Sequence, residues 1–71
     1  MKKFNSKTFR EKNYFILYDK DDYIICYFDN YQELSTRLNY RCSDLVYKFN
    51  QYGNLISIVI GNKLYKLYTS C

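Results

Sequence analysis

Residues 28–34, with the sequence FDNYQEL, decide the fold of this 71-residue chain. Before them, apolar residues alternate with the two-residue period of a β-strand, and after them they recur with the spacing of an amphipathic helix. Asn30 is a favourable N-cap residue, and Glu33 follows three positions later, as in a capping box. The stretch therefore predicts a junction between a β-hairpin and a helix.

The segment before the junction predicts that hairpin. Tyr14, Ile16 and Tyr18 fall on one face of a strand over residues 13–19. Phe15 and Leu17 fall on the other face. Lys-Asp-Asp at residues 20–22 is typical of a turn, because aspartate side chains bond to nearby backbone groups. Residues 23–28 are aromatic and β-branched, and they predict the returning strand.

Two short helices are predicted after the junction. The first ends near Asn39 and Tyr40. The second is capped by Ser43 and ends at Gly53, which is placed in the left-handed conformation that terminates many helices. Their apolar stripes consist of Tyr31, Leu34 and Leu38 in the first helix and Leu45, Val46, Phe49 and Tyr52 in the second.

A second hairpin completes the pattern. Residues 55–60 form the strongest strand pattern, Gly61-Asn62 matches a two-residue hairpin loop, and residues 64–68 pair back. The predicted order is ββ-α-α-ββ, an α+β domain with one antiparallel sheet packed on two short helices. Two short helices cover only one face of such a sheet. The other face is predicted to present tyrosines and aliphatic side chains to solvent, to a partner or to a second copy.

Charge divides the chain into a basic N-terminal arm over residues 1–12 and a compact domain over residues 13–71. The net charge is +4, and residues 13–71 contain six cations and six carboxylates. The arm is expected to be a solvated terminus or short extra element, or alternatively to contact phosphate groups on binding nucleic acid. Against the single carboxylate of Glu11, the arm carries Lys2, Lys3, Lys7, Arg10 and Lys12.

The composition argues against catalysis and against a cofactor. The chain has no His, and its three cysteines, Cys26, Cys42 and Cys71, are too far apart for a zinc or redox motif. No Gly-rich phosphate loop is present. The acidic cluster at residues 19–22 lacks the spacing of a calcium loop, so no metal site is expected. With no signal-peptide pattern and no membrane-spanning apolar run, the expected location is the cytoplasm.

Four segments, residues 14–19, 27–34, 45–49 and 62–68, carry a likeness to known proteins. Through them, most of the chain from Asn13 onward resembles small proteins of phages and mobile elements in low-GC bacteria. Its middle part is also similar to short modules appended to homing endonucleases, in which a strand pair precedes a helix–turn–helix. That resemblance implies DNA binding, with Ser35 and Lys48 in place of the small and basic residues of those modules. Small phage proteins include anti-CRISPR inhibitors of defence nucleases.

The leading hypothesis is a non-enzymatic phage-type protein that binds a host protein or nucleoprotein, most concretely a defence nuclease. The alternative is a helix–turn–helix-like regulator or accessory module that binds DNA directly, with its recognition helix starting at Ser43. A homodimer formed through the tyrosine face is a further hypothesis, and no membrane partner is expected. The residues expected to contact a partner are Arg37, Arg41, Tyr47 and Lys48 around the helices, with Tyr14 and Tyr18 on the uncovered sheet face.

Overall fold

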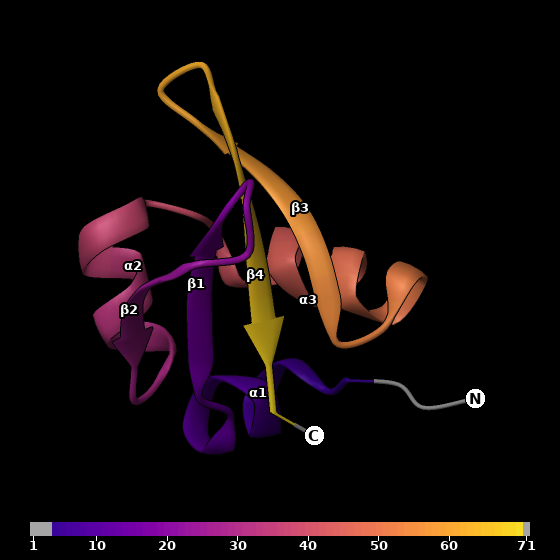
Figure 1. The fold of residues 1–71 in the computed structure, drawn as a ribbon. Coiled ribbons are helices and arrows are strands. Elements are labelled where there is room, and N and C mark those ends of the chain that lie inside the picture. The colour runs from indigo at the N-terminus through magenta and orange to yellow at the C-terminus, as the bar shows by residue number, and fades with distance from the viewer. Residues whose placement is uncertain (1–3, 71) are drawn as a thin grey trace.

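Four antiparallel strands form one sheet, and three helices of the described residues, 4–70, lie against one of its faces (Figure 1). The structure is a computed structural model. The strand order across the sheet is β2-β1-β4-β3, so β1 and β4 are central. In chain order the elements are α1 (Ser6–Lys12), β1 (Phe15–Asp19), β2 (Ile24–Phe28), α2 (Tyr31–Leu38), α3 (Cys42–Tyr52), β3 (Leu55–Ile60) and β4 (Lys63–Thr69).

The predicted α+β class and the order ββ-α-α-ββ are confirmed, and α1 precedes that unit. The junction at residues 28–34 forms as expected. Asn30 Oδ1 accepts a hydrogen bond from the Glu33 backbone N–H at 3.0 Å. Glu33 Oε1 accepts one from the Asp29 N–H at 3.2 Å. The first bond satisfies a backbone N–H in the first turn of α2, where no preceding turn supplies a carbonyl acceptor. The second closes the cap at the residue before the N-cap.

Three predicted details of α3 are wrong. The helix begins at Cys42 after the N-cap residue Arg41, which makes no side-chain cap hydrogen bond, so Ser43 lies within the first turn. The earlier start carries the Cys42 side chain into the core, where it is 7% exposed. Tyr52 is 71% exposed and does not extend the buried stripe. Gly53 ends the helix with a positive φ of 97°, but its ψ of −156° lies outside the left-handed helical region.

The sheet register decides which residues face the helices. Phe15 lies opposite Phe28 and Thr69, and Leu17 lies opposite Leu67. These side chains are buried, as are Ile56 and Ile58 of β3. Gly61 and Asn62 join β3 to β4 with positive φ angles of 55° and 68°, which suits the predicted two-residue turn. The core therefore lies between the sheet and the helices, where it also includes Leu34, Leu45, Val46 and Phe49.

The segment predicted as a basic arm contains a helix that belongs to the folded domain. Asn5 caps α1, and Phe9 of α1 is only 1% exposed. The Phe9 ring lies edge-on to Phe15, with centroids 5.2 Å apart, and 5.8 Å from Phe49. Residues 6–12 thus form the short extra element that was one of the expectations for this segment. Lys2 and Lys3 lie outside the described residues.

We expect Phe9→Ala to lower the free energy of unfolding by about 3–5 kcal/mol, because it leaves a cavity among three other phenylalanine rings. Urea unfolding followed by circular dichroism measures this change. Lys7→Ala, on the exposed side of the same helix, is the control, with an expected effect within about 0.5 kcal/mol. Equal, small effects of the two substitutions would show that α1 is not docked in solution.

Candidate functional site

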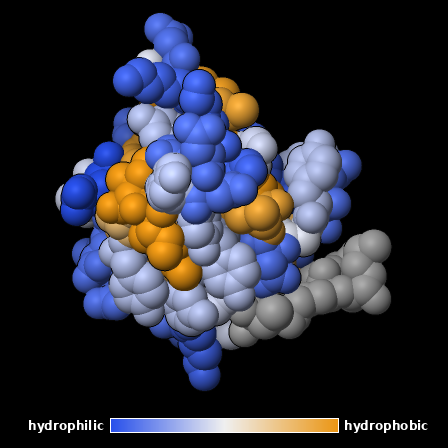
Figure 2. Space-filling view, viewed as in Figure 1, coloured by the Kyte–Doolittle hydropathy of each residue, from blue (hydrophilic) through white to orange (hydrophobic). Residues whose placement is uncertain are grey.

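The sheet face turned away from the helices is covered by no helix of the described residues. In β1, Tyr14, Ile16 and Tyr18 alternate with the buried Phe15 and Leu17, which confirms the predicted division of this strand. Their strand partners face the same way, because opposite residues of a sheet share a face. Figure 2 shows apolar and weakly polar side chains gathered over the strands on this side. We define the open face as Tyr14, Ile16, Tyr18, Ile24, Tyr27, Leu55, Ser57, Val59, Leu64, Lys66 and Tyr68.

Three tyrosines form an aromatic cluster at one end of the open face. The Tyr14 ring lies 5.6 Å from the Tyr27 ring and 6.3 Å from the Tyr68 ring, measured between centroids. Tyr27 remains 55% exposed in spite of this contact. Rings held by their neighbours lose little further conformational freedom when a partner covers them, which suits them to an interface.

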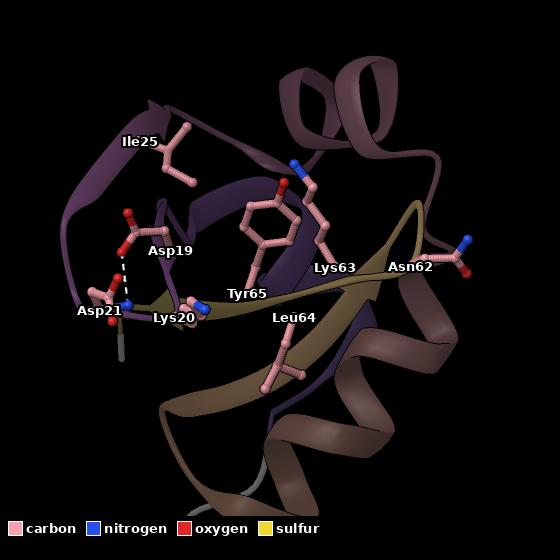
Figure 3. A pocket seen from close by; sticks show the side chains of 8 residues that line it. All are labelled: Asp19, Lys20, Asp21, Ile25, Asn62, Lys63, Leu64 and Tyr65. Carbon is pink, nitrogen blue, oxygen red and sulfur yellow. Dashed lines mark hydrogen bonds between the residues drawn. The ribbon is translucent and has the colours of Figure 1, made fainter.

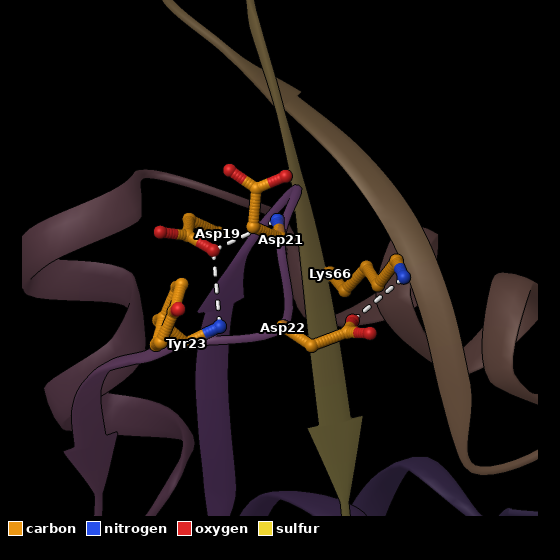
Figure 4. A network of polar contacts seen from close by, with 5 residues as sticks. All are labelled: Asp19, Asp21, Asp22, Tyr23 and Lys66. Carbon is orange, nitrogen blue, oxygen red and sulfur yellow. Dashed lines mark hydrogen bonds and ion pairs between the residues drawn. The ribbon is translucent and has the colours of Figure 1, made fainter.

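The turn between β1 and β2 stands over the other end of the open face. Asp19 Oδ1 accepts hydrogen bonds from the backbone N–H groups of Asp21 and Tyr23, at 2.9 and 3.0 Å (Figure 4). Asp22 takes a positive φ of 71° and forms an ion pair with Lys66 Nζ at 2.7 Å. The ion pair neutralises the lysine of the open face. Beneath the turn lies a shallow hollow of about 330 Å³, lined by Tyr18, Asp22, Leu55, Lys66 and Tyr68.

The outer edge of β3 is closed by side chains from the helical side. Tyr40 Oη donates to the Val59 carbonyl at 3.0 Å and accepts from the Val59 N–H at 3.3 Å. Lys48 Nζ donates to the Ser57 carbonyl at 3.4 Å. These bonds occupy backbone groups that an added strand would need, so they oppose pairing at this edge.

We expect Tyr40→Phe to destabilise the domain by about 1 kcal/mol, because it removes both hydrogen bonds to Val59. Hydrogen exchange should become faster at the Val59 amide. Tyr47→Phe is the control, since Tyr47 is 67% exposed on α3, and it should change neither quantity. Unchanged protection of Val59 in Tyr40→Phe would contradict the closed edge.

The helices and the residues that join them carry most of the positive charge. This helical layer has exposed Arg10 and Lys12 on α1, and Arg37 and Arg41 at the end of α2 and the start of α3. Its cations number six and its carboxylates three among the described residues. The cations are Lys7, Arg10, Lys12, Arg37, Arg41 and Lys48, and the carboxylates are Glu11, Glu33 and Asp44.

Tyr31 connects the helices at the centre of this layer. Its hydroxyl donates to the Tyr40 carbonyl, which holds the α2–α3 connection against α2. Burial raises the pKa of the Tyr31 phenol, the electrostatic influence of the neighbouring Cys42 side chain acts in the same direction, and the positive charge of Arg10 acts against both. The hydroxyl therefore stays protonated, and able to donate, across the neutral range.

The connection between α2 and α3 has the length of a helix–turn–helix. Residues 39–41 join the two helices, and Asn39 adopts the left-handed conformation, with φ 58° and ψ 37°. A turn of three or four residues, often with glycine, joins the helices of that motif. The exposed side chains of α3 are Ser43, Asp44, Tyr47, Gln51 and Tyr52.

The residues predicted to contact a partner fall into two groups on different sides of the molecule. Tyr14 and Tyr18 belong to the open face, and Arg37, Arg41 and Tyr47 are exposed in the helical layer. Lys48 is half-buried and bonded to the β3 edge. Of the residues predicted to contact nucleic acid, Lys7, Arg10 and Lys12 lie on α1. Tyr27 and Tyr68 were absent from the predicted set, although strand alternation places them with Tyr14.

A hollow of about 570 Å³ lies between the tips of the two hairpins (Figure 3). Its lining combines Asp19, Asp21, Lys20 and Lys63 with the hydroxyl of Tyr65. The Asp19 carboxylate already accepts two backbone hydrogen bonds within the turn. These two bonds hold the Asp19 carboxylate in place within the turn.

Within residues 4–70, no three His, Cys, Asp or Glu side chains gather in a way that could hold a metal ion. The same part of the chain contains no helix with the length and apolar character needed to cross a membrane. Cys26 is half-buried and Cys42 is buried, and both are free thiols.

The chain was compared with protein-family models, curated proteins and solved structures. No family model, no curated protein and no solved structure matches the chain.

Proposed function

We propose that this chain is a small non-enzymatic binding protein of phage type that attaches to a nucleoprotein in the bacterial cytoplasm. Its most concrete target is a defence nuclease that carries a guide RNA or a DNA substrate, which the chain inhibits. The observation that carries the proposal is the separation of charge, with a cationic helical layer on one side and an open, nearly uncharged sheet face on the other. The resemblance to small phage proteins supports the same function.

The helical layer has the mixed chemistry that suits a protein with bound nucleic acid. Arg37 and Arg41 supply guanidinium groups, which form bidentate hydrogen bonds with phosphates and carboxylates. Tyr47 supplies an exposed ring of the kind that dominates protein interfaces. Asp44 lies on the same helix and would repel a bare phosphate backbone. This combination favours a target with both protein and nucleic-acid surfaces.

We expect the chain to restore phage growth in bacteria protected by one of a panel of RNA-guided and restriction nucleases. Arg37→Glu combined with Arg41→Glu should weaken that inhibition roughly tenfold or more, because carboxylates replace two guanidinium groups at the contact. Plaque counts, and cleavage of a DNA substrate by the purified nuclease, measure the effect.

Lys20→Glu combined with Lys63→Glu is the matched control. It makes the same change in net charge at two exposed positions at the tips of the hairpins, away from the helical layer. We expect it to leave inhibition within about threefold of the native chain. Equal loss in the two double variants, or no protection against any nuclease of the panel, would contradict the proposal.

Direct DNA binding is a second candidate, favoured by the three-residue α2–α3 turn with Asn39 in the left-handed conformation. In this reading α3 enters the major groove and the cations of α1 contact phosphates. Against it, the only cation within α3 is Lys48, which bonds to the β3 edge.

The two candidates are separated by the salt dependence of binding to a fluorescent DNA duplex of random sequence. Direct binding predicts measurable affinity at low salt that falls steeply as salt is added, with a logarithmic slope of about 0.9 for each phosphate neutralised. Absence of binding at low salt would remove this candidate. Inhibition of a nuclease by the same preparation would then leave the leading proposal intact.

A further inference from the structure

We propose that the open face is the interface of a homodimer, in which two copies stack their sheets face to face about a two-fold axis. The proposal is independent of the proposed function, because the residues invoked there lie in the helical layer. Three properties of the open face point to a second copy as its occupant: its area, its charge, and the closed or interrupted edges beside it.

The area of the open face matches what a stable dimer needs. Tyr27 is 55% exposed, Ile24 65% and Val59 58%, and Leu55 and Leu64 are each about half exposed. Scaled by side-chain size, the exposed parts of these five side chains and of Tyr14 amount to roughly 700 Å². An interface of standard size removes about that area from each partner. A second copy that covers most of the face therefore forms an interface of ordinary size.

The charge of the open face allows it to meet itself. Lys66 is its only charged member, and the ion pair with Asp22 at 2.7 Å neutralises that charge within the same chain. Two copies of a neutral face meet without repulsion, and few charges need to be desolvated. The helical layer, with an excess of cations, would repel its own copy. Depletion of charge and enrichment in aliphatic and aromatic side chains are typical of homodimer interfaces.

Pairing through the sheet edges is opposed on both sides. Tyr40 and Lys48 occupy backbone groups on the outer edge of β3. At the other edge, the register between β1 and β2 shifts between Leu17 and Tyr18, a bulge of the kind that twists an edge away from a partner strand. Two copies of this chain therefore associate through their open faces, with their sheets about 10 Å apart.

Such a dimer turns its two helical layers outward on opposite sides. Each copy then presents Arg37, Arg41 and Tyr47 to solvent. The cluster of Tyr14, Tyr27 and Tyr68, in contrast, lies between the copies. Tyrosine hydroxyls at the rim retain contact with water while their rings are covered.

Sedimentation velocity of the full chain, in reducing buffer, tests the dimer from about 1 µM to about 1 mM. We expect the mass to rise from 8.7 kDa to twice that value with concentration. Tyr27→Lys and Val59→Lys should each weaken association roughly tenfold or more, because each places an unpaired ammonium group within the interface. Tyr47→Lys is the matched control: it introduces the same charge at a more exposed tyrosine, on α3, and should leave association unchanged.

A single 8.7 kDa species over the whole range would overturn the proposal. Equal weakening by Tyr27→Lys and Tyr47→Lys would also overturn it. Circular dichroism verifies that each variant is folded.

Isotope-filtered NMR on a mixture of labelled and unlabelled native chain provides a test without substitutions. Contacts between copies should involve Tyr27 and Val59, and contacts from Tyr47 in their place would exclude the open face. A strict monomer that still inhibits a nuclease would refute the dimer alone.

Discussion

The pairing of β1 with β4 is the interaction on which the rest of the structure depends. It joins residues near the two ends of the chain, with Phe15 opposite Thr69 and Leu17 opposite Leu67. The buried Asn13 side chain extends the pairing by donating to Thr69 Oγ1 at 3.0 Å. Because β1 and β4 are the central strands, this register sets the inward and outward faces of both hairpins together. A shift by one residue would bury Tyr68 and expose Leu67.

The one-sided cover of the sheet gives the molecule two surfaces with different chemistry. Phe9, Phe15 and Phe49 bring α1 and α3 together over one face, and their rings contact each other. No element of the described residues covers the opposite face. The cations are concentrated on the covered side, and the one lysine of the open face is paired with Asp22. A small domain thereby separates an apolar contact surface from a cationic one.

The local patterns of the chain predicted much of the fold and part of the candidate site. The cap at Asn30, the turn at Gly61-Asn62 and the alternation in β1 depend on neighbours in sequence, and each forms as expected. The prediction that Ser43 caps α3 was wrong because a favourable cap residue competed with the burial of Cys42, and the helix begins at Cys42. Phe9 was assigned to a basic arm because its neighbours are polar. Its burial results from Phe15 and Phe49, which are distant in sequence.

The sequence by itself determined the kinds of element, their order and which residues of a strand share a face, because strand period, helix period and turn chemistry act over a few residues. It also determined that one sheet face would be left uncovered, since its helices are few and short. Only the tertiary structure decided which tyrosines share that face. It placed Tyr14 beside Tyr27 and Tyr68, brought Asp22 to Lys66, and set Tyr40 on the β3 edge. These contacts join distant segments, so they arise from strand register and helix packing and have no signature in any local stretch.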